Sequence, residues 1–231
     1  MVHDFLAESV YMGVILTLGT YCIGIWLRKT TGWALMNPLL VSILLSIAFL
    51  SFTGTTYESY SNGAEVISYL LTPATVCLAV PLYEQLEHLK RNYHAVALGI
   101  TAGVLASMTS ILGMVLLLEM DHEAYVTLLP KSITTAIGMG VSEELGGRVP
   151  VTILVIVITG ITGNIFAEKF LRLIKVKEPI AKGIAIGSAS HVIGTSKAME
   201  MGQTEGAMSS LAIVTSGVLT VITASLFAQL A

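Results

Sequence analysis

The residues best suited to chemistry gather in three stretches of an otherwise apolar chain. The first, "GSASHVIGTSKAMEMG" at 187–202, holds hydroxyls, a histidine and a lysine. The others are "TPAT" at 72–75 and "PKSITT" at 130–135. Prolines and glycines interrupt helices, and the N–H groups exposed at the start of a half-helix bind anions. The residue types therefore favour a cavity that binds a small carboxylate.

Two ionisable residues in these stretches have roles that the sequence leaves open. His191 is either a proton carrier, since imidazole titrates near neutral pH, or a packing histidine. Lys131 is either a fixed counter-charge to an anion or a side chain that extends to the outer surface. Each Ser or Thr either lines the cavity or hydrogen-bonds a neighbouring helix.

The elements that position these residues are membrane helices. Hydrophobic residues make up 54% of the 231 residues and charged residues 12%, with a mean hydropathy of +0.81. Soluble domains are about a quarter charged. A membrane span needs roughly 20 mainly apolar residues. The fold class predicted is an all-α polytopic membrane protein, because six uncharged runs have this length: Ser9–Leu27, Ala34–Tyr57, Val66–Tyr83, Asn92–Leu118, Val149–Ala167 and Gly206–Ala231.

The loop charges predict the topology. Basic residues follow the first and third runs, and five more lie in 168–182, whereas the loops at 54–65 and 119–124 are acidic. Basic loops stay in the cytoplasm, so the N-terminus is expected outside. Tyr125–Gly147 must then enter and leave on one face as a re-entrant segment. The alternative is a surface loop with an amphipathic helix. With the stretch at 187–202 as a span, the total is about seven transmembrane helices.

An internal repeat gives the expected domain plan. Shifting the chain by 114 residues places "ITAGVLASMTSILGMVLL" on "VTSGVLTVITASLFAQL". The two copies would run in opposite directions across the membrane, which is a recurring plan of transporters with broken helices. We expect a single domain over 1–231, with one repeat at about 30–118 and the other at about 125–231. A homodimer would provide a fixed scaffold for a moving repeat.

Motifs for enzymes, metals and cofactors do not occur in the sequence. There is no phosphate-binding glycine loop, HExxH, CxxC or nucleophile elbow. The two cysteines, Cys22 and Cys77, both fall inside apolar runs, so neither a disulfide framework nor a metal cluster is expected. We therefore expect no catalytic activity, no catalytic residue, no metal and no cofactor.

Four sequence blocks resemble the LrgB/CidB family. They are "NPLLV" (37–41), "TPATVCLAVPLYEQL" (72–86), "PKSITTAIGM" (130–139) and "ASHVIGTSKAMEMGQTEGAMSSLA" (189–212). The resemblance implies a bacterial inner-membrane protein, often encoded beside a holin-like partner of the LrgA/CidA type. A plant relative resembles a plastid glycolate/glycerate transporter. Bacterial relatives are tied to pyruvate movement and to the control of murein hydrolases and autolysis.

These blocks and the broken helices together define a predicted substrate site. The site is expected where 72–75 and 188–195 meet, with the segment around Lys131 contributing. His191 is the candidate for proton coupling. The predicted substrate-binding residues are Asn37, Thr72, Pro73, Thr75, Lys131, Ser132, Thr134, Thr135, Ser188, Ser190, His191, Thr195 and Ser196.

Two functions from different classes follow from the sequence. The first is transport of small monocarboxylates such as pyruvate, glycolate or glycerate, coupled to H⁺ or Na⁺. The second is an antiholin-like regulator of murein hydrolase activity that acts with an LrgA/CidA-type partner. Broken helices with buried hydroxyls and a basic residue favour transport at this stage, since a regulator has no need of such a cavity. No nucleic-acid partner is expected.

Overall fold

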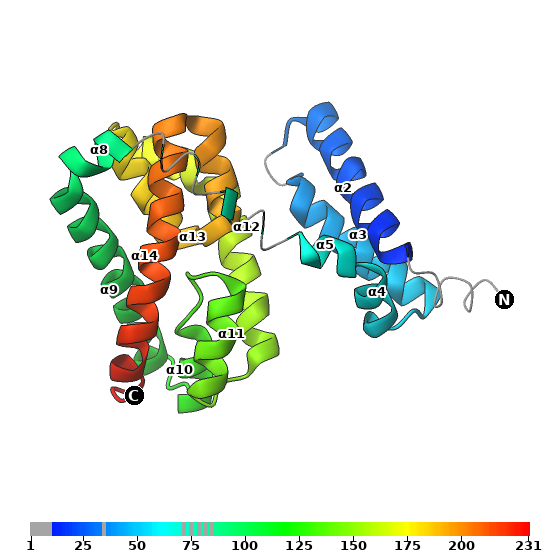
Figure 1. Ribbon diagram of the computed structural model, residues 1–231. Helices are drawn as coiled ribbons and strands as arrows, with labels where there is room; N and C mark the ends of the chain where they lie inside the picture. The colour runs from blue at the N-terminus through cyan, green and yellow to red at the C-terminus, as the bar shows by residue number, and fades with distance from the viewer. Residues whose placement is uncertain are drawn as a thin grey trace. The chain divides into compact units, whose positions relative to one another are not determined.

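The chain folds into helices. The computed structural model describes residues 11–33, 36–70, 73, 76, 77, 80, 83 and 86–231. Across these residues the regular structure is entirely helical, which confirms the all-α class. The chain forms two compact units, Met1–Cys77 and Leu78–Ala231. Figure 1 shows the helices of each unit.

Small residues bring the helices of the first unit into close contact. Its described part contains α2 (Met12–Thr31), α3 (Pro38–Thr53), α4 (Tyr57–Gly63) and α5 (Glu65–Tyr69). A Cβ atom on Gly24 would lie 2.7 Å from the carbonyl oxygen of Pro38, so α2 and α3 touch backbone to backbone. Thr20 Oγ1 and Ser42 Oγ, 2.9 Å apart, add a buried hydrogen bond between the same helices.

The second unit surrounds one central helix, α13. Its described helices are α8 (Leu86–Arg91), α9 (Tyr93–Leu117), α10 (His122–Leu128), α11 (Thr135–Glu144), α12 (Val149–Leu173), α13 (Pro179–Met201) and α14 (Gln203–Ala228). Helix α13 packs against α9, α12 and α14 (Figure 1). Buried apolar side chains such as Ile100, Ile184 and Met208 fill the space between α9, α13 and α14.

Three of the described helices are long and apolar enough to cross a bilayer, namely α9, α12 and α14. A helix of 25 residues is roughly 37 Å long, which exceeds the hydrocarbon thickness of about 30 Å. Their outward side chains are apolar: Leu117 on α9 is 83% exposed and Phe170 on α12 is 57% exposed. Such surface suits lipid rather than water. The total of seven spans and the inverted repeat stay predictions.

Glycines at helical spacing join α13 closely to α14. Gly183 and Gly187 are four residues apart and share one face of α13. A Cβ atom at either position would collide with a backbone carbonyl oxygen of α14, that of Glu205 or that of Ser209. Close approach through small residues is the usual way in which membrane helices associate. Gly183 and Gly187 therefore serve the packing of α13 against α14.

Candidate functional site

A turn between two short helices positions Lys131. Helix α10 ends at Leu128, and α11 starts at Thr135. Pro130 has no N–H group to continue the α10 ladder, and the chain turns there. The Lys131 N–H donates to the carbonyl oxygen of Leu128 at 3.1 Å. We call residues 129–134 the lysine turn.

Within the described residues, the Lys131 side chain is held by two hydroxyl groups. Its Nζ donates to Ser132 Oγ at 3.0 Å and to Ser107 Oγ of α9 at 3.4 Å. The two hydroxyls lie 2.9 Å apart. Among the described residues, no carboxylate lies within ion-pair distance of Lys131. Burying a cation without an anionic partner is costly, so the charge of Lys131 is not balanced by the described part of the chain.

The two ends of the segment around the lysine turn meet. Glu123 of α10 and Arg148, at the start of α12, form an ion pair of 2.6 Å. The hydrogen bond from Arg148 holds the pKa of the Glu123 carboxyl below its usual range. The Arg148 N–H also donates to Thr127 Oγ1 at 2.8 Å. A hairpin with joined ends is the geometry expected of a re-entrant segment, whose membrane placement stays a prediction.

Helix α13 is broken at one residue, His191. Its backbone has φ 43° and ψ −144°, inside a run that is otherwise helical. The ring Nε2–H donates to the carbonyl oxygen of Ile156 on α12 at 2.9 Å. The carbonyl oxygen of His191 accepts from Thr195 Oγ1 at 2.9 Å, and Thr195 Oγ1 lies 2.7 Å from Ser209 Oγ of α14. The break is thus stabilised by partners within the protein.

Two glycines of α12 make room for this break. A Cβ atom on Gly160 would lie 2.6 Å from His191 Cε1. A Cβ atom on Gly163 would overlap Ser190 Oγ. His191 itself is 2% exposed, because α12 approaches so closely. The glycines of α12 therefore leave the space that the break in α13 requires.

An apolar groove runs between α12 and α13, and Lys131 is one of the residues that line it. Its volume is 740 Å³. Helix α13 contributes Ala181, Ala185 and Ala189, at every fourth residue, and these small side chains leave the space open. We call this space the α12–α13 groove. Four polar residues line it: Lys131, Thr159, Thr162 and Ser190.

The structure brings several of the predicted site residues of the second unit together. Lys131, Ser132 and Ser190 lie at or beside the groove, and Thr134 is the N-cap of α11, directly before Thr135. Asn37 caps α3 in the first unit, where its Oδ1 accepts from the N–H groups of Leu39 and Leu40. Pro73 has a helical backbone and is exposed, while Thr72 and Thr75 lie outside the described residues.

The remaining predicted hydroxyls bond within or between helices. Ser188 Oγ donates to the carbonyl oxygen of Ile184 in its own helix at 2.7 Å, and Thr195 belongs to the His191 break. Ser196 Oγ donates to the carbonyl oxygen of Ile193 at 2.7 Å. This is the packing alternative that the sequence left open for individual hydroxyls.

Comparison with known proteins places the whole chain in one family. The profile of the LrgB-like family matches residues 17–230. The chain belongs to the LrgB family. The antiholin-like protein LrgB of Bacillus subtilis (strain 168) is 37% identical to it over 223 residues, which is 96% of each chain. No solved structure matches. Family membership and three span-length apolar helices together make this a membrane protein.

Two residues of this LrgB family chain were missed by the sequence reasoning. Ser107 completes the hydroxyl set around Lys131. Asn164 of α12 donates its amide to the carbonyl oxygen of Ile193 at 2.9 Å and to Ser196 Oγ at 2.8 Å, which secures the half-helix after the break. A carboxamide within a long apolar run was the available signal for Asn164. No comparable signal in the sequence marked Ser107, since isolated serines are common in membrane spans.

Proposed function

We propose that this LrgB family member is an antiholin-like regulator of murein hydrolase activity in the bacterial inner membrane. The observation that carries the proposal is the 37% identity to an antiholin-like protein across 96% of both chains. The match extends over both units, so the similarity is not limited to a few helices. The comparisons thus favour the regulator over transport, the reverse of the preference from sequence. An LrgA/CidA-type membrane protein is the proposed partner.

A gene deletion tests the regulator. Cells that lack the chain should lyse faster and release more murein hydrolase activity in a zymogram than the parent strain. Re-expression of the chain should restore the parent behaviour, and co-purification should recover the holin-like partner. Unchanged lysis and hydrolase activity in the deletion strain would contradict the proposal.

Transport of small monocarboxylates is the second candidate, and one observation favours it. Lys131 is partly buried, pairs with no carboxylate among the described residues and lines the α12–α13 groove. A carboxylate leaving water needs several donors at once. Lys131 Nζ, the hydroxyls of Ser132 and Ser107, and the N–H groups at the start of α11 would supply them. Thr134, the N-cap of α11, leaves those N–H groups without a side-chain bond.

A proton accompanies the anion in this second proposal. His191 is the candidate carrier, and its Nε2–H is already committed to the carbonyl oxygen of Ile156. Nδ1 is therefore the ring atom that would take up and release the proton. Na⁺ coupling is the alternative. The transport proposal also includes a homodimer, which would provide a fixed scaffold for the moving part of each protomer.

Liposome uptake separates the two candidates. Purified protein alone would be reconstituted, and uptake of labelled pyruvate, glycolate and glycerate would be followed across a pH gradient. Uptake above empty liposomes supports a carrier, and cross-linking in the same liposomes tests the homodimer. Absence of uptake of all three acids in either gradient direction, with folded protein, would remove the transport proposal and leave the regulator standing.

A further inference from the structure

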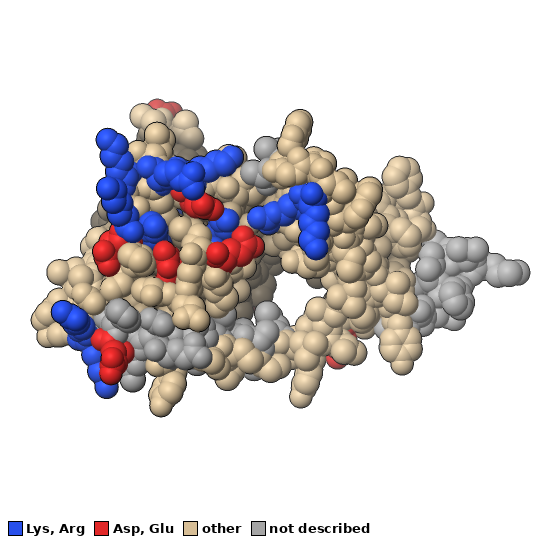
Figure 2. Space-filling model, turned by 90° about the horizontal axis from the view of Figure 1, so that it is seen from above, with Lys and Arg blue, Asp and Glu red and all other residues tan. Residues whose placement is uncertain are grey.

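The turn that joins α12 to α13 concentrates positive charge. Residues 168–182 hold five basic and two acidic side chains. Figure 2 shows Lys and Arg side chains gathered on this face of the second unit, with acidic side chains among them. Helix α12 is a candidate span, so its end lies where a membrane helix meets the lipid headgroups. A basic turn at that depth faces phosphate groups.

Two lysines that lie between α12 and α13, Lys175 and Lys177, have no ionic partner among the described residues. Arg172 pairs with Glu168 at 3.1 Å, and Lys182 lies 4.0 Å from Glu205. Glu168 is also neutralised by Lys197 at 2.9 Å. In the described part of the chain, Lys175 and Lys177 form no ion pair, and both are exposed. Their charge is therefore available to a ligand.

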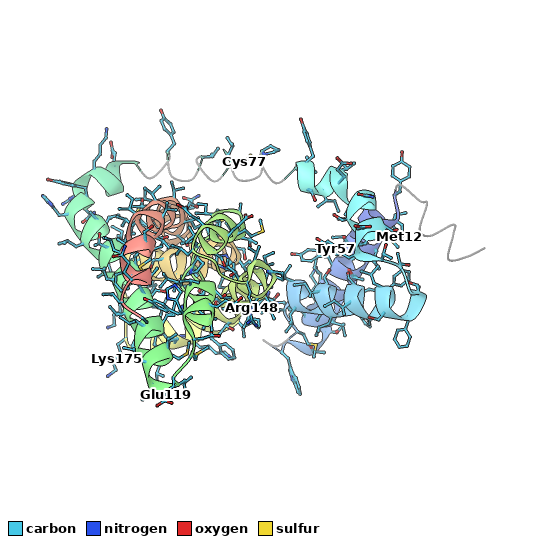
Figure 3. The ribbon with its side chains drawn as sticks, turned by 90° about the horizontal axis from the view of Figure 1, so that it is seen from below. Met12, Tyr57, Cys77, Glu119, Arg148 and Lys175 are labelled. Carbon is cyan, nitrogen blue, oxygen red and sulfur yellow. The ribbon has the colours of Figure 1, made fainter. Side chains whose placement is uncertain are left out.

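Lys175 occupies a backbone position that normally selects glycine. Its φ is 60°, in the left-handed region. Its N–H donates to the carbonyl oxygen of Arg172, and the Val176 N–H donates to that of Leu171. This is the hydrogen-bond pattern of a helix end whose left-handed residue is usually glycine. A lysine is strained here, which suggests that its side chain is used. Figure 3 shows Lys175 at the outer edge of the second unit.

A basic pocket at this turn adjoins the α12–α13 groove. The pocket has a volume of 290 Å³ and is lined by four basic side chains and one carboxylate: Arg172, Lys175, Lys177, Lys182 and Glu168. The carboxylate of Glu168 is already paired with Arg172 and Lys197. Leu171 and Val176 line both the pocket and the groove. Beyond them the groove is lined by Phe166, Phe170 and Ile174. A pocket lined mainly by basic side chains thus lies next to an apolar groove.

We propose that the basic pocket and the adjoining groove bind one anionic phospholipid. The phosphate lies among Lys175, Lys177 and Lys182, and an acyl chain lies along the groove against Phe170 and Ala189. A free phosphate would use the pocket and leave the groove unused, whereas a zwitterionic lipid would bring its own cation next to the two lysines. An anionic phospholipid is the ligand that satisfies both parts.

Native mass spectrometry of the full chain in mild detergent tests the headgroup. Phosphatidylglycerol and phosphatidylcholine with identical acyl chains would be titrated. We expect phosphatidylglycerol to bind roughly tenfold more tightly, because it keeps its net negative charge. The double substitution Lys175→Gln with Lys177→Gln should abolish this preference. The matched control, Lys90→Gln with Arg91→Gln, removes two charges from α8 and should leave the preference intact. Equal affinity for the two lipids, or equal losses in both double variants, would overturn the proposal.

A second pair of measurements tests the apolar part. Ala189→Phe places a ring in the groove without touching the basic pocket, so it should weaken long-chain phosphatidylglycerol and spare a short-chain analogue. Glycerol phosphate, which has the headgroup without chains, should compete poorly. Competition by glycerol phosphate as strong as that of the lipid would assign the pocket to a free phosphate. If Ala189→Phe disrupts self-association and leaves lipid affinity unchanged, the groove holds a second copy of the chain, and the lipid proposal is wrong.

Discussion

The lysine turn and the His191 break are two interruptions of helices in the same unit, and they differ in what satisfies them. At the break, the ring of His191, its carbonyl oxygen and the hydroxyl of Thr195 all bond to protein groups. At the lysine turn, Lys131 contacts two serine hydroxyls and no carboxylate among the described residues. The first interruption is closed by the protein, and the second has spare binding capacity.

This difference teaches that polarity inside a membrane protein has two separate uses. A buried polar group that finds all its partners internally specifies one packing arrangement. A charged group that has only neutral partners can still form an ion pair with a ligand. Substitutions at the break should therefore change stability, and substitutions at the lysine turn should change binding.

The largest expected effect comes from closing the space beside the break. Gly160→Leu forces a side chain into the position of His191 Cε1 and should lower the free energy of unfolding by about 3 kcal/mol. Gly113→Leu is the matched control, because a Cβ atom at Gly113 meets nothing within 4 Å. Thermal unfolding in detergent measures both. Equal melting temperatures for the two variants would show that the close packing of α12 against His191 does not contribute to stability.

Removing the histidine itself should cost less. His191→Ala loses a buried hydrogen bond and leaves a cavity, and should lower the free energy of unfolding by roughly 2 kcal/mol. If His191 also carries a proton, uptake by the remaining folded protein should lose its dependence on pH. Stability equal to that of the parent protein would mean that the break does not depend on the ring.

Lys131→Ala should show the opposite pattern. Carboxylate binding should weaken about tenfold, as expected for a lost charged hydrogen bond. Stability should hold or rise, since a half-buried cation without a counter-charge is removed. Lys131→Arg keeps the charge and should retain most of the affinity. Isothermal titration with pyruvate measures the affinities. A stability loss in Lys131→Ala as large as that of His191→Ala would erase the distinction between the two interruptions.

The smallest effect concerns the ion pair that joins the ends of the segment. Glu123 has a pKa below its usual range because Arg148 donates to it, so the carboxylate form stabilises the fold. This contribution is complete above roughly pH 5 and is lost as the pH falls through the lowered pKa. Comparing melting temperatures of the parent and Glu123→Gln from neutral to acid pH should show curves that converge in acid. Parallel curves would contradict the assignment.

The sequence predicted the long helices well and the break less well. The run at Asn92–Leu118 became α9 (Tyr93–Leu117), because uninterrupted apolar residues leave the backbone no alternative in lipid. The break was expected in the glycine-rich stretch of α13, and it occurs at His191 rather than at Gly187 or Gly194. Those glycines are held helical by contacts with other side chains and backbone.

The contacts around Lys131 were beyond what a linear pattern can show. Ser107 and Ser132 are 25 residues apart and belong to different elements, so no helical periodicity links them. The same holds for Asn164 and Ser196. Pairings of this kind depend on how α9, α12 and α13 are placed in space, which tertiary packing decides.

The glycine contact between α13 and α14 also has a consequence for the order of assembly. These helices are joined by the single residue Gly202, so their contact closes a very short loop. The entropic cost of closure grows with loop length. The α13–α14 hairpin should therefore form early, and α9, about 80 residues upstream, should dock against Ser188 later. Ser107 and Lys131 are only 24 residues apart, so by the same reasoning their contact should form before α9 docks on α13.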